Sequence, residues 1–276
     1  MEKEKLKKLE QKAKQIRKTT IEMFGKLGFG HIGGSMSVVE VLTVLYYEHM
    51  SVDSADPHNP KRDKLVLSKG HAGPTLYSIL ADKGFFPKQW LETLNRGGTR
   101  LPSHCDKNLT PGIDMSTGAL GQGLSVAVGM ALANRLDKID SKIYVIIGDG
   151  ESNEGQVWEG AMASAHFELN HLIAFTDFNK MQIDGYTHEI MKLEDLSAKW
   201  ASFGWFTQRI DGHDISQLDS AIRRAKLEKS RPSMIILDTI KGKGAFFAEG
   251  KVINHHMSFD LETAREAIRI LDSQTA

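Results

Sequence analysis

The chain has 276 residues, enough for one large or two small domains, and its hydrophobic content of 41% is sufficient for a packed core. Its formal net charge is zero with a pI near 7.2, so nothing indicates binding to nucleic acid or to an anionic membrane. No apolar run approaches the length of a membrane span, the N-terminus is charged, and the single cysteine, Cys105, excludes an internal disulfide, so we expect a cytoplasmic protein.

The first quarter of the chain predicts two helices joined by a glycine-dense loop. Residues 2–24 carry apolar side chains at helical spacing, which is typical of a helix packed along a larger body. The loop at 28–35 precedes a second predicted helix at 38–50. Such a loop can hold phosphate, although neither a P-loop nor a complete dinucleotide fingerprint is present. On its own, His31 in this loop is more often structural.

The next stretch predicts a short buried strand at 64–68, directly followed by His71, and then a helix at 74–83. A histidine at the carboxyl end of a strand can serve catalysis or phosphate binding. The neighbouring His104 and Cys105 do not predict a cysteine nucleophile, because adjacent residues rarely form a nucleophile–base pair. A second glycine-rich turn at 116–123 leads into a helix of small residues.

The centre of the chain predicts a β-α-β unit with polar residues at the end of each strand. A strand at 144–147 ends in Gly-Asp-Gly, and after a helix at 156–169 a second strand ends shortly before Asn179. A right-handed crossover brings the two strand ends together, so Asp149 and Asn179 would face one small volume. Their oxygens suit Mg²⁺, with diphosphate, water and the carbonyl of Met181 completing the shell. A lone Gly-Asp-Gly is more often a turn.

The last third predicts further strands at 204–210 and 234–239 and helices at 195–203, 215–228 and from residue 261. His213 lies in a turn ahead of a helix, and we interpret it as structural. The adjacent His255 and His256 do not predict a metal site, because no Cys or third spaced His lies near them.

Several of these motifs resemble one family. Gly148-Asp149-Gly150, followed after residues 151–178 by Asn179, resembles the diphosphate-binding motif of thiamine-diphosphate enzymes, with Phe178 where many members have Asn. Three further segments resemble the N-terminal half of transketolase: GHIGGSMSVVEVL, in which Ile32 replaces the usual Pro, RDKLVLSKGHAGPTLYSILADKGFF and TGALGQGLSVAVGMALA. The resemblance covers about residues 5 to 260, with the motifs in family order.

The resemblance implies an α/β fold, a three-layer sandwich with a mostly parallel central sheet, as one diphosphate-binding domain over 1–276 on which a helix at 1–25 packs. It implies thiamine diphosphate and Mg²⁺ (or Ca²⁺) as cofactors, with Asp149, Asn179 and Met181 on the metal. The implied cofactor contacts are His71, Gly118, Ala119, Leu120, Gly148, Asp149, Gly150, Glu151, Asn179 and His256. The implied catalytic residues are His31, His71, His104, His256 and Glu154. His256 is preferred over His255, although Met257 replaces the usual glycine.

The resemblance also implies a partner. Transketolases continue into a pyrimidine-binding domain, so we expect this chain to be the N-terminal subunit of a split transketolase. A separate C-terminal subunit would carry the pyrimidine-binding domain in an α2β2 assembly. The enzyme would transfer a two-carbon ketol unit from a ketose (phosphate) to an aldose (phosphate). Two alternatives stay open: another thiamine-diphosphate reaction, such as 1-deoxyxylulose-5-phosphate synthesis or 2-oxo acid decarboxylation, and a non-catalytic cofactor-binding subunit.

Overall fold

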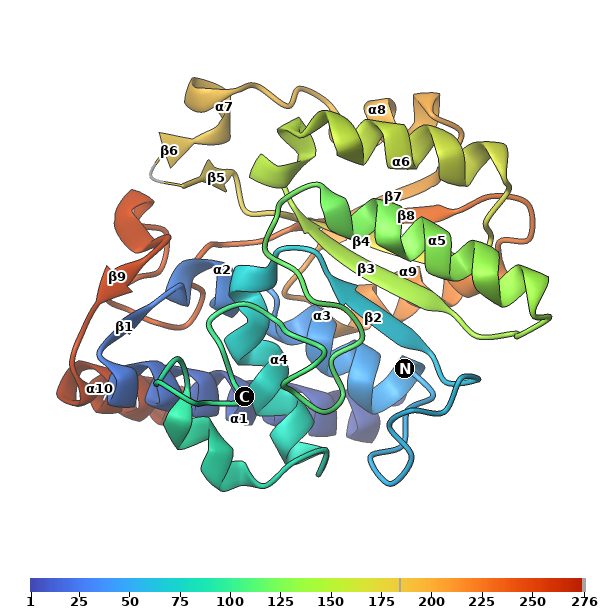
Figure 1. Ribbon diagram of the computed structural model, residues 1–276. Helices are drawn as coiled ribbons and strands as arrows, with labels where there is room; N and C mark the ends of the chain where they lie inside the picture. Colours follow the sequence, from blue (N-terminus) through green and yellow to red (C-terminus); the bar gives the residue numbers. More distant parts are fainter. Residues whose placement is uncertain (184, 275–276) are drawn as a thin grey trace.

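A parallel five-stranded sheet forms the centre of the protein (Figure 1). The computed structural model describes residues 1–183 and 185–274. The strands are arranged in the order β2-β3-β4-β8-β7, and each neighbouring pair is parallel. Their bounds are β2 Lys64–Leu67, β3 Ile143–Gly148, β4 Leu172–Phe178, β7 Phe206–Asp211 and β8 Ser233–Asp238.

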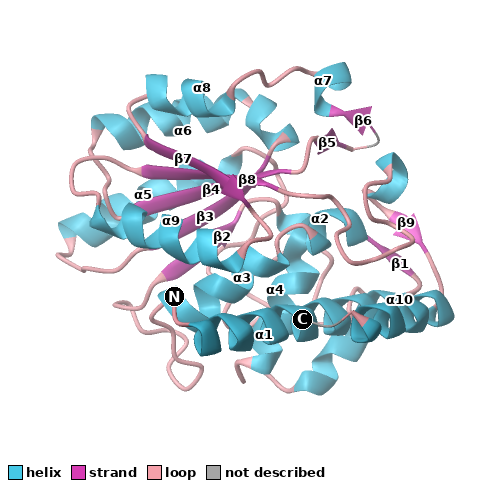
Figure 2. Ribbon diagram, turned by 180° about the vertical axis from the view of Figure 1, so that it is seen from behind, coloured by secondary structure: helices cyan, strands magenta, loops and turns pink. Residues whose placement is uncertain are grey.

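Helices cover both faces of this sheet, as Figures 1 and 2 show from opposite sides. Successive side chains of a strand point to opposite faces, so Tyr144 and Ile146 join one apolar cluster while Val145 and Ile147 join the other. The predicted three-layer α/β sandwich is therefore confirmed. One face is covered by α5 Gln122–Leu136, α6 Gly155–His166 and α8 Leu196–Ser202, and the other by α3 Val39–Val44, α4 Gly73–Asp82 and α9 Ile215–Leu227. Helices α1 Lys3–Leu27 and α10 Leu261–Ser273 pack against each other outside α3 and α4.

The β3-α6-β4 unit sets the geometry of the site. Both strands run in the same direction, with Gly148 paired opposite Asp177. The amide of Asp149 donates to the carbonyl of Asp177 over 3.2 Å, so the two chains leave the sheet side by side. This register brings Asp149 and Asn179 to neighbouring positions at the carboxyl edge, as the crossover rule predicts.

The predicted helix at 38–50 and the loop before it differ from the structure. The helix is divided into α3 and a π-helical turn, Leu45–His49, and α2, Ile32–Met36, occupies part of the expected loop. The glycines of α2 allow a close approach, because a Cβ on Gly34 would lie 2.7 Å from Nε2 of His71.

Short elements that sequence patterns did not predict border the carboxyl edge of the sheet. Two pairs of short antiparallel strands join segments there. Among the helices of the described residues, none is long and apolar enough to cross a membrane. The short elements at this edge are β1 Phe29–Gly30 paired with β9 Met257–Ser258, β5 Met181–Gln182 paired with β6 Gly185–Tyr186, α7 Thr187–Ile190, and the 3-10 turns Gly70–Ala72, Gly150–Asn153 and Val252–Asn254. A further 3-10 turn, Lys88–Thr93, packs against α1 and α4 instead.

Two glycines of α5 allow a test of how closely this helix must approach the sheet. A Cβ on Gly123 would lie 2.9 Å from the Cα of Ser68, whereas a Cβ on Gly129 would meet no atom within 4 Å. We expect Gly123→Ala to lower the free energy of unfolding by about 1–3 kcal/mol, because the backbone must shift. Gly129→Ala should raise it by about 0.5–1 kcal/mol through helix propensity. Urea unfolding followed by tryptophan fluorescence measures both, and equal effects would contradict this packing.

Candidate functional site

A cavity of about 150 Å³ lies at the carboxyl edge of the sheet, where β2, β3, β4 and β8 end. It brings together most of the residues that the sequence predicts for cofactor and metal binding. The lining comprises the predicted residues His71, Leu120, Gly148, Asp149, Gly150, Glu151, Glu154, Asn179 and Met181, together with Gly34, Lys69, Gln182, Ile183, Lys241 and His255.

Asp149 is a buried carboxylate held by two backbone amides. Its side chain is supplied by the turn after β3, accepts from Gly150 N at 2.8 Å and from Lys180 N at 2.5 Å, and the residue is only 2% exposed. Burial, and next the nearby charge of Asp177, raise the pKa of Asp149 to about 7. A cation beside this carboxylate would offset both effects, so the site fits a bound metal ion.

The side-chain amide of Asn179 is held in one orientation. Its Nδ2 donates to Asp177 Oδ2 over 2.9 Å, and its Oδ1 accepts from Met181 N over 3.1 Å, which turns the amide oxygen toward the start of β5. Within residues 1–183 and 185–274, no group of three or more His, Cys, Asp or Glu side chains could hold a metal ion. A cation here would therefore take amide, carbonyl or phosphate oxygens besides Asp149, as the sequence predicts.

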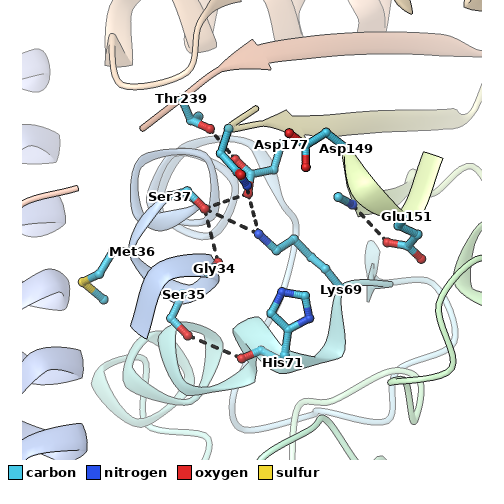
Figure 3. Close-up of polar contacts among 12 residues, drawn as sticks. Gly34, Ser35, Met36, Ser37, Lys69, His71, Asp149, Glu151, Asp177 and Thr239 are labelled. Carbon is cyan, nitrogen blue, oxygen red and sulfur yellow. Dashed lines mark hydrogen bonds and ion pairs between the residues drawn. The ribbon is translucent and has the colours of Figure 1, made fainter. Parts of the chain in front are cut away.

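Asp177 is the polar centre beneath the cavity (Figure 3). Its carboxylate pairs with Lys69 and accepts from Ser37 at 2.7 Å, Thr239 at 2.5 Å and Asn179 at 2.9 Å. Burial by itself would raise the pKa of Asp177, but Lys69 and these hydrogen bonds lower it. The carboxylate stays ionised and ties together the ends of β2, β4 and β8 and the turn between α2 and α3.

The carboxylate of Glu151 accepts hydrogen bonds from three other residues of the chain. It accepts from Ser68 Oγ, from Gly121 N at 2.8 Å and from Gly148 N at 3.0 Å, and burial raises its pKa. It thereby joins the Gly-Asp-Gly turn to the glycine-rich turn before α5. The predicted cofactor contact of Glu151 would thus come from its backbone.

The other predicted residues lie around the rim. Leu120 lines the cavity with 40% of its surface exposed, while Gly118 and Ala119 precede it and do not line the cavity. The backbone of Gly118 has φ +137°, and a Cβ there would meet the ring of His104. Glu154 is exposed at the cavity edge, immediately before α6.

Five histidines from distant parts of the chain gather beside the cavity. The ring centroids of His31 lie 5.6 Å from His71, 5.4 Å from His104, 5.4 Å from His255 and 4.8 Å from His256. Burial lowers the pKa of four of these histidines and is the largest cause in each case. It lowers the pKa of His31 to about 3 and that of His255 to about 4. The pKa of His71 falls well below its usual value, and the pKa of His104 is also lowered. These four rings are therefore neutral near pH 7.

The structure distinguishes the two adjacent histidines. His255 lines the cavity with Asp149, and its ring centroid lies 5.2 Å from that of His71. The ring of His256 packs against Phe29, with centroids 5.7 Å apart, and lines a separate small cavity together with His31. The geometry thus favours His255 for contact with a ligand in the main cavity, and the preference for His256 stays a prediction without such support.

Sequence patterns missed the two lysines of the cavity. Lys69 and Lys241 are 1% and 2% exposed, and Lys241 Nζ donates to the carbonyl of Ile183 over 3.0 Å. Lys69 lies directly before Gly70-His71 in a segment that the sequence singled out, and Lys241 follows the predicted strand at 234–239 by two residues. A lysine next to a strand end is too common a signal to predict a buried ammonium group.

Comparison with known proteins identifies the family. Residues 9–271 match the family described as transketolase, thiamine diphosphate binding domain. The chain belongs to the transketolase family. This confirms the resemblance seen in the motifs, and the family description agrees with the predicted cofactor, thiamine diphosphate.

Relatives of similar length include proteins named as transketolase subunits. The chain is 57% identical to the 6-deoxy-6-sulfo-D-fructose transketolase subunit SqwG of Clostridium sp. (strain MSTE9), over 97% of this chain and 98% of the relative. It is 41% identical to an apulose-4-phosphate transketolase subunit of Phocaeicola vulgatus, over 95% of this chain and 92% of the relative.

Solved transketolases share the fold but are much longer. The transketolase of Campylobacter jejuni superposes with a TM-score of 0.89 at 30% identity, over 96% of this chain and 42% of that one. The R525L variant of the Pichia stipitis enzyme gives 0.87 at 31% identity, over 94% and 40%. The chain therefore spans less than half the length of these transketolases.

The two aspartates at the strand ends should affect stability with opposite signs. The folded, cofactor-free chain has an Asp149 pKa of about 7 against an ordinary value of 3.8, so it retains a proton that the unfolded chain releases. Stability therefore falls as pH rises from about 4 to about 7. We expect Asp149→Asn to remove this penalty and to raise the free energy of unfolding at pH 8 by roughly 1–4 kcal/mol.

Asp177→Asn is the matched variant. The lowered pKa of Asp177 means that its stabilisation is present near neutral pH and is lost in acid. We expect a loss of about 3–5 kcal/mol at pH 8, because Lys69 is left buried without its counter-charge. Urea unfolding of both variants at pH 5, 6.5 and 8 measures the two effects. A shift of both variants in the same direction at pH 8 would contradict the assignment.

Proposed function

We propose that this chain is the diphosphate-binding, N-terminal subunit of a two-chain transketolase. The observation that carries the proposal is the placement of Asp149 and Asn179 at the ends of adjacent parallel strands, facing the same cavity as His71 and His255. The lengths of the relatives support it, because the chain matches a transketolase subunit over 98% of that subunit but the Campylobacter jejuni enzyme over only 42%.

In this proposal the cavity holds the diphosphate end of thiamine diphosphate. Asp149, Asn179 and the carbonyl of Met181 would bind Mg²⁺ (or Ca²⁺), and the donor set fits because Asp149 is a buried carboxylate whose raised pKa a cation would reverse. Lys69 and Lys241 also line this cavity and would place positive charge near the phosphate oxygens. When bound, thiamine diphosphate supplies the electron sink for cleaving and forming a carbon–carbon bond next to a carbonyl.

The histidines would bind the sugar and handle protons. A neutral imidazole has one N–H donor and one acceptor nitrogen, so the four rings of His31, His71, His104 and His255 can contact sugar hydroxyls with either role. Ser103 Oγ lies 3.1 Å from Nδ1 of His104, which leaves Nε2 of His104 for a substrate hydroxyl. Their lowered pKa values keep these rings neutral near pH 7, so each offers an acceptor nitrogen as well as an N–H donor.

The relatives suggest a substrate class. Their named substrates, 6-deoxy-6-sulfo-D-fructose and apulose 4-phosphate, are sugars with a terminal anionic group. We propose a ketose of this kind as donor, with 6-deoxy-6-sulfofructose first because of the 57% identity, and an aldose phosphate as acceptor. The partner would be a separate C-terminal subunit with the pyrimidine-binding domain, in an α2β2 assembly.

Reconstitution tests the proposal. We expect no ketol transfer by this chain alone, and transfer when it is mixed with its C-terminal subunit, Mg²⁺, thiamine diphosphate and ribose 5-phosphate as acceptor. Donors would be compared as kcat/KM: 6-deoxy-6-sulfofructose, fructose 6-phosphate and xylulose 5-phosphate. Asp149→Ala should reduce activity to background. If the mixture binds cofactor but decarboxylates a 2-oxo acid, or turns over no substrate, ketol transfer is the wrong reaction.

The adjacent histidines provide a second test. In the reconstituted enzyme His255→Gln should lower kcat/KM at least about 100-fold, the usual range for a group that contacts reacting atoms. His256→Gln should lower it less than about 5-fold, because its ring packs on Phe29 outside the main cavity. Steady-state kinetics at saturating cofactor decide between them. The reverse order of effects would return the role to His256.

A further inference from the structure

The loop that follows β8 carries Lys241 into the cavity. Residues 239–244 leave the sheet, and the buried Lys241 lines the same cavity as Asp149 while its Nζ donates to the carbonyl of Ile183. The loop turns sharply, since Gly242 and Gly244 have φ values of +82° and +81°. The loop forms neither a helix nor a strand, so hydrogen bonds from other segments must hold its backbone in place.

One such contact comes from His213, on the turn between β7 and α9. The amide of Ile240 donates to Nε2 of His213 over 2.9 Å, and Nδ1 of the same ring lies 2.9 Å from Oε2 of Glu40. Because Nε2 accepts a hydrogen bond, the ring proton must be on Nδ1, where it is donated to Glu40. His213 is thus held in a single tautomer between α3 and the loop, immediately before Lys241.

Arg17 of α1 holds the other side of Lys241. Its guanidinium pairs with Glu40, donates to the carbonyl of Lys243 and reaches the carbonyl of Met36 over 2.9 Å. Burial would raise the pKa of Glu40, but Arg17 and His213 lower it to about 2, so the carboxylate stays charged between them. The amide of Gly242 also donates to the carbonyl of Gly33 over 3.0 Å. Main-chain atoms on both sides of Lys241 are therefore held by one network of hydrogen bonds.

We propose that Arg17, Glu40 and His213 are positioning residues that set the Lys241 ammonium against the anionic end of the cofactor. The inference rests on the proposed function and goes beyond it, because none of the three residues lines the cavity. The network contacts the backbone of the loop at Ile240 and Lys243 and leaves the Lys241 side chain to the cavity. Loosening the network should therefore weaken cofactor binding without removing a cofactor contact.

Two substitutions of His213 separate its two hydrogen bonds. Glutamine places a carbonyl oxygen near the position of Nε2 and can still accept from Ile240, whereas asparagine places its amide near Nδ1 and keeps only the bond to Glu40. In the assembled two-chain enzyme with Mg²⁺, we expect His213→Asn to raise the Kd for thiamine diphosphate about 10-fold, and His213→Gln less than about 3-fold. Isothermal titration measures both, independently of turnover. The KM of the sugar should not change.

Two controls separate positioning from general stability. His49→Gln disturbs another buried histidine, which pairs with Asp219 far from the cavity, and should lower Tm without changing the Kd. Lys241→Met should weaken cofactor binding at least as much as His213→Asn, and adding His213→Asn to it should have no further effect.

A Kd that follows Tm across the His49 and His213 variants, or additive effects of Lys241→Met and His213→Asn, would overturn the positioning role. In either case the unchanged assembly would still bind cofactor, and the proposed function would stand. Absence of thiamine diphosphate binding by the unchanged assembly would overturn both.

Discussion

The buried ion pair between Lys69 and Asp177 is the interaction on which the site depends. At most 2% of either side chain is exposed to solvent, and the carboxylate also accepts hydrogen bonds from Ser37, Thr239 and Asn179. These contacts join the ends of three strands and the turn after α2. A buried charge without its partner is costly, so the ends of these strands are held in a single arrangement. The Asn179 amide takes its orientation from the same carboxylate.

The neighbouring Asp149 is buried without a partner of opposite charge. Among the described residues, no cationic side chain lies within hydrogen-bonding distance of its carboxylate. Its raised pKa reflects the cost of burying this carboxylate near Asp177. Strain gathers at the same place, because Lys180 and Ile183 adopt positive φ values of 67° and 51° directly after Asn179. A site that is costly when empty is stabilised by what it binds. We interpret this edge of the sheet as built for a cation and an anion together.

Exposed apolar side chains lie in and near the lining of the cavity. Leu120 and Ile183 line it and are 40% and 61% exposed, and Ile253, two residues before His255, is 65% exposed. Exposed apolar groups beside a binding site are typical of a surface that another protein covers. This agrees with the proposed pairing to a C-terminal subunit and with a chain that spans only 42% of the Campylobacter jejuni transketolase.

The sequence by itself determined the β3-α6-β4 unit and the meeting of Asp149 with Asn179. Apolar runs, glycine turns and the right hand of the crossover are local properties, so they could be read along the chain. Only the tertiary structure decided that five histidines meet, that His255 and not His256 reaches the main cavity, and that Lys241 is buried there. These depend on packing between segments far apart in sequence, such as the pairing of β1 with β9, which brings the segment of His255 and His256 beside His31. No local pattern records such a register.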